Sequence, residues 1–361
     1  MDMQNKFFSG LKVVEFSSVL AGPAVGMFFA ELGAEVVKIE NKTTGGDVTR
    51  GWKHTAESPE SPISAYWCSV NWGKKHLLLD LSNPEDHQQA TELAIAADVV
   101  ISNFKPSSAQ RMGVDAATLR AANPRLIYAQ LSSFADPEDE SPAFDAILQA
   151  EAGFLYMNGE PDRMPVKMPV ALIDVLAAHQ LKEAILIALL HRERTGEGST
   201  VSTSLMEAAL ASLVNQASNY LMNAHIPQRM GTRHPNIAPY GDLFACADGQ
   251  MVLLAVGTER QFKQLCQCLD MNDLSGNPLF SNNQARVQNR ERLNEILADA
   301  ISKRPLDEWI PFFKSQGVPA ARIRDMKAVF DLPEAQAMVL EETTATGQPT
   351  QRMKTLAFKI T

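Results

Sequence analysis

Short β-rich runs alternate with helical stretches through the first half of the chain, and this alternation constrains the fold more than any other sequence feature. Strands are expected at LKVVEF, AEVVKIE, HLLLDL, DVVISNF and RLIYAQL, which begin at Leu11, Ala34, His76, Asp98 and Arg125. Helices are expected near residues 24–32, 84–96 and 116–122. Strands that alternate with helices form mainly parallel sheets, so the sequence predicts an α/β fold with a Rossmann-like domain.

Ligands of open parallel sheets bind beyond the carboxyl ends of the strands, so a site is expected after Phe16, Glu40, Leu81 and Phe104. The loop SSVLAGP lacks the G-x-G-x-x-G turn that binds dinucleotide phosphates, and Pro23 has no N–H to offer such a phosphate. Glu40 is therefore weak evidence for an acid that binds ribose. The sequence favours a Rossmann-like scaffold without a nicotinamide cofactor.

A second region follows the long apolar segment that begins near Asp174. The elements expected from there on are a helix from Val175 to about Arg192, a strand at 201–203, and helices at 205–224, 259–269 and 289–300. Between them, GTRHPNIAPYGDLFACADGQMVLLAV combines prolines, glycines and alternating apolar residues, which indicates the strands of a smaller α+β domain. The length of 361 residues also fits about two domains.

Composition and charge argue against several classes of protein. A net charge of −9 disfavours nucleic acid as a partner, because phosphate neutralisation needs a concentrated basic face. No apolar stretch reaches about 18 residues and MDMQNKFFSG does not resemble a secretory signal, so we expect no membrane span and a cytoplasmic protein. The histidines and cysteines show no metal-ligand spacing, so no metal is expected.

Five basic residues lie near the ends of the expected strands: Lys74, Lys75, Lys105, Arg111 and Arg125. Individually they are typical of solvated surface charge, although several of them can converge on one polyanion. A small anionic ligand therefore remains compatible with the acidic chain, because a few local cations outweigh distant charges within a Debye length.

Asp174 stands near the start of the apolar run ALIDVLAAHQLKEAILIALL and has two interpretations. As an N-cap, its side chain accepts backbone N–H groups in the first turn of the following helix. As a nucleophile, its carboxylate attacks an activated carbonyl group. Spacing alone favours the cap, because a short polar residue before a helical apolar run usually marks a helix boundary.

Segments along nearly the whole chain resemble the class III coenzyme A-transferases, a family that includes formyl-CoA transferase, carnitine CoA-transferase and α-methylacyl-CoA racemase. In family order, these segments are LKVVEFSSVLAGPAVGMFFAELGAEVVKIE, GDVTRGW, LLLDL, ADVVISNFKPSSAQRMGV, NPRLIYAQLSSF, FDAILQAEAG, RERTGEGSTVSTSLMEA, MGTRHPNIAPY and SQGVPAARI. The resemblance implies that Asp174 is the catalytic nucleophile, which reverses the preference for a simple cap.

The resemblance also implies that coenzyme A (CoA) lies across the sheet ends of the first domain. Asp145 matches an acid that orients the nucleophilic aspartate. The residues expected to contact CoA are Val19, Leu20, Ala21, Asn41, Leu79, Leu81, Asn103, Phe104, Arg111 and Phe144. CoA is expected as part of the substrate, with no permanently bound cofactor.

The implied reaction transfers CoA from an acyl-CoA thioester to a free carboxylic acid through an aspartyl anhydride and an aspartyl-CoA thioester. An aspartate with an ordinary pKa of about 3.9 is ionised at neutral pH without help from a base. A helix N-terminus near Asp174 is expected to help keep it ionised. The segment GDVTRGW favours formate or oxalate as the acids. Leu20 argues against them, because the formyl-CoA transferases have a glutamine at this position.

Two alternatives stay open. The racemase branch carries a histidine immediately before the aspartate of the FDAILQ segment, where this chain has Phe144, and an aromatic ring cannot transfer a proton at an α-carbon. A CoA-binding protein without turnover is the other alternative, and Asp174 argues against it.

The resemblance finally implies a homodimer of two interlocked, ring-shaped subunits. The expected division is a large domain at 1–202 to which 335–361 returns, a linker helix at 203–224, a small domain at 225–322 and a linker at 323–334. The expected partners are therefore an acyl-CoA, a small carboxylic acid and a second copy of the chain.

Overall fold

A computed structural model describes residues 7–136, 138–139, 141, 143–344 and 347–360. The chain forms two compact units. The first consists of Met1–Ala152, Met168–Val214 and Gln336–Thr361, and the second of Gly153–Lys167 and Asn215–Ala335. Each unit contains a hydrophobic core of its own.

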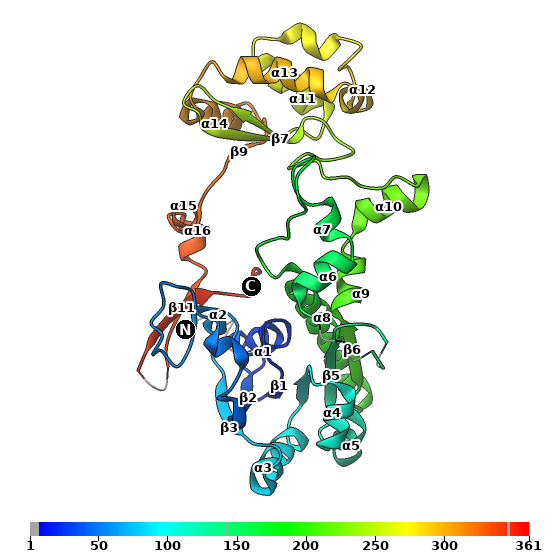
Figure 1. The fold of residues 1–361 in the computed structure, drawn as a ribbon, viewed down its shortest axis with the longest axis vertical. Coiled ribbons are helices and arrows are strands. Elements are labelled where there is room, and N and C mark those ends of the chain that lie inside the picture. The colour runs from blue at the N-terminus through cyan, green and yellow to red at the C-terminus, as the bar shows by residue number, and fades with distance from the viewer. Residues whose placement is uncertain (1–6, 137, 140, 142, 345–346, 361) are drawn as a thin grey trace. The chain divides into compact units, whose positions relative to one another are not determined.

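The first unit is built on a six-stranded sheet in which all neighbouring strands are parallel, in the order β3-β2-β1-β4-β5-β6 (Figure 1). The strands are β1 (Lys12–Phe16), β2 (Glu35–Asn41), β3 (Lys75–Leu79), β4 (Val99–Ser102), β5 (Ile127–Ser132) and β6 (Thr200–Ser204). The prediction of an α/β fold with a mainly parallel sheet is confirmed. The order of the strands reverses between β1 and β4, which is where ligands of Rossmann-type sheets bind.

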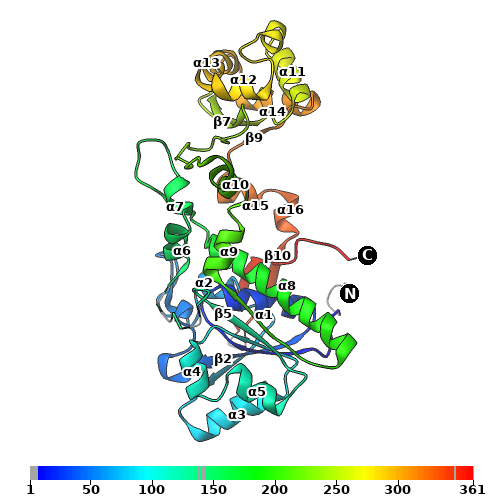
Figure 2. The same cartoon turned by 90° about the vertical axis from the view of Figure 1, so that its right-hand side faces the viewer.

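Helices cover both faces of this sheet (Figure 2). One face carries α1 (Ala21–Glu31) and α8 (Leu172–Thr195), and the other carries α3 (Pro84–Ile95), α4 (Pro106–Arg111) and α5 (Ala116–Ala122). Because both faces are covered, the central strands are apolar throughout, and Val99, Val100 and Ile101 of β4 have no exposed surface.

Shorter elements complete the first unit. They are the 3-10 helices η2 (Lys42–Thr44) and η3 (Val48–Gly51), α2 (Ala65–Cys68), α6 (Asp145–Glu151), α9 (Leu205–Ala211) and the hairpin of β10 (Val339–Thr343) and β11 (Pro349–Met353). After the hairpin, the backbone N–H groups of Thr355 and Leu356 donate to the carboxylate of Glu31 on α1, at 2.8 and 3.1 Å. These hydrogen bonds tie the last described segment to the start of the fold.

The second unit combines a three-stranded antiparallel sheet with helices. The strands are β7 (Tyr240–Ala245), β8 (Met251–Ala255) and β9 (Ala320–Arg322). The helical elements are α7 (Phe154–Met157), α10 (Val214–Asn223), α11 (Glu259–Cys268), η4 (Asn272–Gly276), α12 (Asn283–Gln288), α13 (Arg290–Ile301), α14 (Leu306–Ser315), α15 (Met326–Phe330) and α16 (Pro333–Gln336). Asp248 and Gly249 form the turn between β7 and β8, with Gly249 at a φ of +76°.

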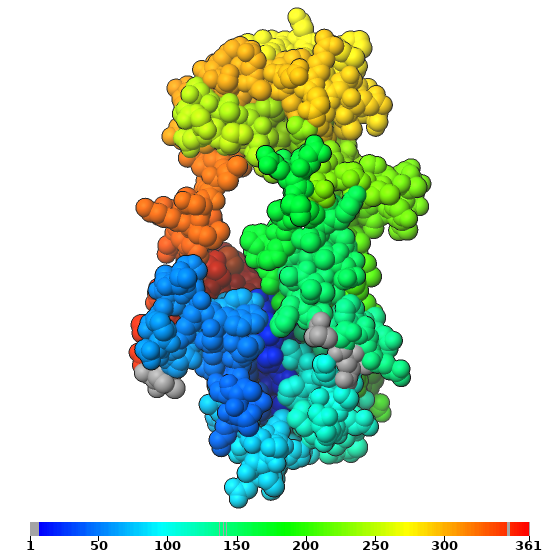
Figure 3. All heavy atoms as spheres, viewed as in Figure 1, coloured from blue at the N-terminus to red at the C-terminus, as the bar shows by residue number. Residues whose placement is uncertain are grey.

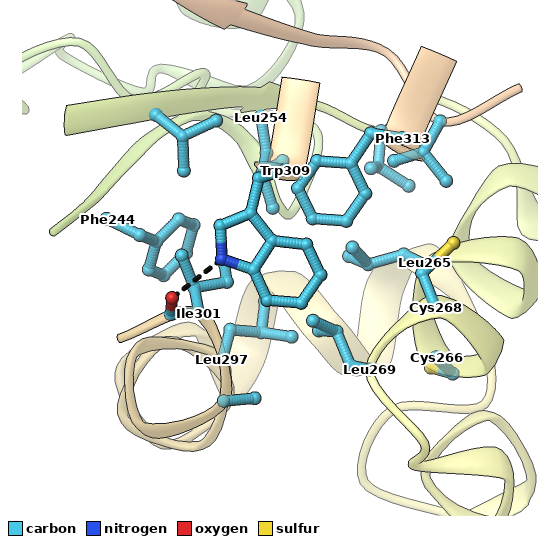
Figure 4. Packing of buried hydrophobic residues seen from close by; sticks show 14 of the residues in the cluster. Phe244, Leu254, Leu265, Cys266, Cys268, Leu269, Leu297, Ile301, Trp309 and Phe313 are labelled. Carbon is cyan, nitrogen blue, oxygen red and sulfur yellow. Dashed lines mark hydrogen bonds between the residues drawn. The ribbon is translucent and has the colours of Figure 1, made fainter. Parts of the chain in front are cut away.

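Trp309 lies at the centre of the core of the second unit (Figure 4). Its ring stacks on Phe313 at 4.8 Å between centroids, and its Nε1–H donates to the carbonyl of Ile301 at 2.8 Å. Cys266 and Cys268 belong to the same core as buried free thiols. Among the described residues, none of the helices is both long and apolar enough to cross a membrane.

Candidate active site

A cavity of about 340 Å³ opens at the carboxyl ends of the central strands of the first unit. Its walls are the loop after β1, the segment after β4 and the segment after β5, together with Asp174 at the start of α8. In the space-filling view, dark-blue atoms from the early part of the chain are recessed between blue and green segments of the same unit (Figure 3). The cavity therefore occupies the reversal point of the strand order, as expected for a sheet of this type.

Asp174 occupies the first turn of α8 and is not its N-cap. The helix begins at Leu172, and the N-cap is Ala171, which makes no capping hydrogen bond through its side chain. The cap interpretation of Asp174 is therefore wrong, because the helix starts three residues earlier than expected. The aspartate side chain is buried at 7% exposure and lines the cavity.

Asp145 provides the missing cap from another element. It is the first residue of α6, and its Oδ1 accepts the backbone N–H of Ile173 at 2.7 Å. Its Oδ2 accepts the side-chain amide of Gln149 at 2.6 Å, and Oε1 of Gln149 accepts the N–H of Met168 at 2.8 Å. Asp145 and Gln149 thereby fix the segment that leads into α8, and with it the position of Asp174.

The electrostatic environment of Asp174 differs from that of an ordinary aspartate. Burial disfavours the charged form, and the nearby negative charge of Asp145 adds to the effect, so that the pKa of Asp174 rises to about 7. In the ligand-free protein, Asp174 is therefore much less readily ionised than an ordinary aspartate. Asp174 therefore departs from the ordinary pKa near 3.9 because of its burial and the charge of Asp145.

Aromatic side chains lie beside the two aspartates. Trp52 makes T-shaped contacts with Tyr66 and Phe144, at 5.2 and 6.2 Å between centroids. Burial and the negative charges of Asp174 and Asp145 raise the pKa of Tyr66 to about 12, so its hydroxyl keeps its proton and remains a hydrogen-bond donor. Phe144 lines the cavity with a ring that carries no transferable proton.

Seven of the predicted site residues line this one cavity: Val19, Leu20, Ala21, Asn103, Phe104, Phe144 and Asp174. Asn103 also holds the loop after β1, because its Oδ1 accepts the N–H of Ser18 at 3.2 Å and its Nδ2 donates to the carbonyl of Ser18 at 3.0 Å. The structure thus brings the segments after β1 and β4 together through a side chain that the sequence singled out.

Four other predicted CoA contacts lie outside the cavity wall. Asn41 caps η2 by accepting the N–H of Thr43, Leu79 is buried in the core, Leu81 packs against that core, and Arg111 donates to the hydroxyl of Ser108 at the end of α4. Their contact with CoA stays a prediction.

Two charged residues have structural roles that the sequence did not indicate. The ammonium group of Lys74 is buried and donates to Oε2 of Glu15 at 2.8 Å, so the interpretation of Lys74 as solvated surface charge is wrong. Glu40 is also buried, and its carboxylate pairs with Arg50 and His76, which hold its pKa well below the usual range although burial acts in the opposite direction.

Sequence reasoning missed several residues of the cavity wall. Ser132 ends β5 and Ser133 follows it, Val48 lies in η3 and Leu205 begins α9. The two serines were within reach of the strand-end rule, because they directly follow a predicted strand. Leu205 comes two residues after the strand expected at 201–203, so the same rule also reaches it, whereas Val48 lies in a segment without such a signal. Within the described parts of the chain, no cluster of three or more His, Cys, Asp or Glu side chains is arranged to hold a metal ion.

Comparison with known proteins identifies the class to which this fold and cavity belong. The chain matches the family described as CoA-transferase family III over residues 8–361. It is 36% identical over 343 residues to the succinate–glutarate CoA-transferase of Agrobacterium fabrum, an alignment that covers 93% of this chain and 85% of the relative. It is 32% identical over 333 residues to the acetyl-CoA:oxalate CoA-transferase of Acetobacter aceti, with 91% and 84% covered.

A solved structure agrees with these sequence matches. The crystal structure of a CAIB/BAIF family protein from Brucella suis superposes with a TM-score of 0.82 at 35% identity, and the match covers 99% of this chain and 93% of that one. The chain belongs to CoA-transferase family III. It is an enzyme of this class, which transfers CoA between acyl-CoA thioesters and carboxylic acids, and the resemblance noted in its segments is confirmed.

Proposed function

We propose that Asp174 carries CoA transfer as a covalent nucleophile. One observation supports this assignment above others: a buried carboxyl group faces the cavity at the reversal point of the sheet, beside Phe144, which cannot transfer a proton. A nucleophile suffices for transfer, whereas racemisation needs a second acid/base group on the opposite face of the substrate.

The proposed sequence has four steps. The ionised carboxylate of Asp174 attacks the thioester carbonyl of the donor, the C–S bond breaks, and CoA thiolate leaves behind a mixed anhydride. The thiolate then attacks the aspartyl carbonyl, which expels the donor acid and forms an aspartyl-CoA thioester. The acceptor carboxylate attacks this thioester to form a second anhydride and thiolate. In the last step the thiolate attacks the acceptor carbonyl, which releases the new acyl-CoA and Asp174.

The surroundings of Asp174 suit both kinds of intermediate. Anhydrides and thioesters hydrolyse, so a largely buried carboxyl group with the apolar side chains of Phe144 and Leu205 on the cavity wall protects them from water. Asp145 acts as a positioning residue through the N–H of Ile173. The protonated hydroxyl of Tyr66 and the backbone at the start of α1 supply donors for the oxyanions that form.

We propose that CoA contacts Val19, Leu20, Ala21, Asn103 and Phe104 at the cavity. The remaining predicted contacts, Asn41, Leu79, Leu81 and Arg111, would then bind parts of CoA beyond the cavity. No permanently bound cofactor takes part in these steps, because the carboxylate and the thiol carry all the bond changes.

Short dicarboxylic acids are the proposed acyl groups. Three of the relatives are named for succinate and glutarate, for mesaconate, and for oxalate, which are all dicarboxylic acids. Ser132, Ser133 and Lys105 on the cavity wall offer hydroxyl groups and a positive charge, which suit a second carboxylate better than an alkyl chain.

Acyl exchange followed by mass spectrometry tests the proposal. Purified protein incubated with succinyl-CoA and a panel of free dicarboxylic acids should form new acyl-CoA species. A peptide that contains Asp174 should carry CoA through a thioester. Asp174→Asn preserves the shape of the side chain without the nucleophile, and it should lower the transfer rate by about a thousandfold or more.

Three outcomes would sink the assignment. Exchange that survives in Asp174→Asn means that another group is the nucleophile. Deuterium that enters the α-position of a 2-methylacyl-CoA in heavy water, without exchange of acids, means that the protein is a racemase. A wild-type protein that binds CoA and exchanges no acid would leave the alternative of a CoA-binding protein without turnover.

We also propose that the protein is a homodimer, with the interlocked subunits and the domain and linker bounds expected from the family. Tyr220, Leu221 and Met222 at the end of α10 are exposed at 52%, 78% and 81%, which is unusual for three consecutive large side chains unless a partner covers them. In light scattering, Leu221→Asp with Met222→Asp should lower the mass to that of a monomer, and Ser218→Asp on the same helix should not.

A cytoplasmic location stays a prediction.

A further inference from the structure

Val19 lines the cavity of Asp174 in a backbone conformation that valine rarely adopts. Its φ angle is +72°, in the left-handed region, where the branched side chain clashes with its own backbone. It lies in the loop that turns the chain from β1 into α1. A conformation of this kind persists only where the surrounding contacts enforce it, and such residues cluster at functional sites.

The enforcing contact comes from Asp47. The N–H of Val19 donates to the carboxylate of Asp47, at 3.4 Å to Oδ1 and 3.2 Å to Oδ2. Asp47 is itself fixed, because its Oδ1 accepts the N–H and the hydroxyl of Thr49 at 3.0 and 2.8 Å, and its own N–H donates to Glu40 at 2.7 Å. The fixed carboxylate of Asp47 therefore accepts the N–H of Val19 from a position outside the cavity wall.

Lys38 joins Asp47 to the beginning of the loop. Its buried ammonium group donates to Oδ2 of Asp47 at 2.9 Å, to Oε1 of Glu15 at 3.0 Å and to the carbonyl of Ser17 at 2.9 Å. The side chains of Lys38, Glu15 and Asp47 have no exposed surface. One cation thus holds the first carbonyl of the loop and the carboxylate that binds the middle of the loop.

Lys74 holds the first turn of α1, directly after the loop, in the same way. Its ammonium group donates to Oε2 of Glu15 at 2.8 Å and to the carbonyl of Pro23 at 2.7 Å. The two lysines and the two acids, Glu15 and Asp47, balance in charge. Buried ion pairs stabilise a fold less than apolar packing does. The main effect of this cluster of two lysines and two acids is therefore to fix the conformation of the loop to which it donates and from which it accepts hydrogen bonds.

The carboxylate form of Asp47 is required by its partners. Four donors point at its two oxygens: the N–H groups of Val19 and Thr49, the hydroxyl of Thr49 and the ammonium group of Lys38. A carboxylate accepts at both oxygens, whereas an amide would turn an NH₂ group towards at least one donor.

We propose that Asp47, held by Lys38, is a positioning residue for CoA transfer, because it enforces the left-handed Val19 that sets the loop between β1 and α1 against the reacting groups at Asp174. This inference rests on the proposed function, since the loop has catalytic meaning only if the cavity holds the acyl-CoA. Asp47 itself does not line the cavity and acts only through the loop.

A double-mutant cycle tests the link between Asp47 and Val19. Asp47→Ala should lower kcat for the transfer of CoA from succinyl-CoA to glutarate by about tenfold or more. In the Val19→Gly background the same substitution should lower kcat by less than about threefold, because glycine adopts the left-handed region without an enforcing contact. A role in stability alone would produce equal losses in both backgrounds and would overturn the proposal.

A matched control removes a similar cap elsewhere in the same unit. Oδ1 of Asp115 accepts the N–H groups of Ala117 and Thr118 at 2.9 and 3.1 Å at the start of α5. Asp115→Ala should leave kcat within about twofold of the wild type at a temperature where both proteins are folded. If Asp47→Ala fails to fold, Asp47→Asn takes its place in the cycle, with a smaller expected loss in the same direction.

Failure of the proposed function is distinguishable from failure of this inference. If the wild type transfers no CoA between any acids, the proposed function fails, and the crystal structure of the Asp47 variant decides the inference. Val19 should then leave the region of positive φ. A Val19 that keeps its left-handed conformation without the carboxylate, or unchanged kcat in a folded Asp47 variant, overturns the assignment.

Discussion

Two carboxyl groups meet at the start of α8, and their surroundings give them different tasks. Asp145 accepts hydrogen bonds from Ile173 and Gln149, so its oxygens are occupied. Asp174 faces the cavity and has a pKa raised to about 7 by burial and by Asp145. Pairs of acids in contrasting environments commonly divide the roles of a reacting and a supporting group.

The raised pKa predicts the pH dependence of the reaction. Asp174 attacks only as a carboxylate, so kcat/KM, which reports the free enzyme, should rise with pH through a midpoint near 7. Asp145→Asn removes a negative charge that disfavours ionisation of Asp174, so the midpoint should move to lower pH. Steady-state rates from pH 5 to about 9 measure both profiles.

Comparison of the wild type with Asp145→Asn also separates the electrostatic effect of Asp145 from its structural effect. Asparagine can keep an oxygen on the N–H of Ile173 but turns an NH₂ group towards the amide of Gln149, and this disturbance lowers the rate at every pH, whereas loss of the charge moves the midpoint. A midpoint that stays in place in Asp145→Asn would mean that burial alone sets the pKa of Asp174.

Asp174→Asn should stabilise the folded protein at alkaline pH. Folding raises the pKa of Asp174 from 3.8 to about 7, so the folded state favours the protonated form and ionisation costs stability. This cost is absent below the unfolded pKa, grows as the pH rises towards 7, and is fully present above pH 8. Asparagine bears no charge, so the gain should reach at most about 4 kcal/mol at pH 8.

Urea unfolding at pH 4 and pH 8 measures this difference. The variant and the wild type should unfold at similar urea concentrations at pH 4, and the variant at a higher concentration at pH 8. Equal stability at both values would contradict the burial of an ionisable group at this position.

The identity of Asp174 as the reacting residue could be predicted from the sequence, but its environment could not. Its identity rests on segments that resemble a known family. Its environment depends on Asp145, which precedes Ile173 by 28 positions and meets it only after folding. For the same reason, the left-handed Val19 and its partner Asp47 carried no sequence signal, because Asp47 reaches Val19 from the cap of η3 and is held there by Lys38 of β2.

At the scale of elements, α1 is constrained by a glycine in its interior. A Cβ atom on Gly26 would overlap the carboxylate of Glu15 and approach the ammonium group of Lys74. Gly26→Ala should therefore destabilise the protein by about 2 kcal/mol or more, although alanine favours helices by about 1 kcal/mol, because it disturbs a buried ion pair. Urea unfolding at neutral pH gives the change in the free energy of unfolding.

Gly276 provides the control for this substitution. It ends η4 in the second unit, and a Cβ atom there would meet no atom within 4 Å. Gly276→Ala should change stability by less than about 0.5 kcal/mol. Equal effects of the two substitutions would show that the ion pair can move without cost.

Elements with local signals were predicted best. The bounds of α5 agree with the expected residues 116–122, because Asp115 caps that helix from the preceding position. The five strands of the first half lie within two residues of their expected bounds. The start of α8 was missed because its cap comes from Asp145 on another helix, and sequence spacing contains no information about that contact.

At the scale of the whole molecule, the chain passes between its two units more than once, and the sequence did not reveal where it does so. Length indicated two domains, and the alternation of elements identified the parallel sheet. The segment Gly153–Lys167 belongs to the second unit although it lies between two parts of the first. Such an excursion depends on contacts between distant segments, which periodicity does not report.

Separate cores predict separate responses to mutation. Trp309→Ala should destabilise the second unit by about 3 to 5 kcal/mol, because it removes the stack on Phe313 and leaves the carbonyl of Ile301 without its donor. Calorimetry should show one transition moved to lower temperature and the other unchanged. Met326→Ala, at a side chain exposed at 70%, should move neither. A uniform shift of all unfolding in Trp309→Ala would mean that the two units fold as one cooperative body.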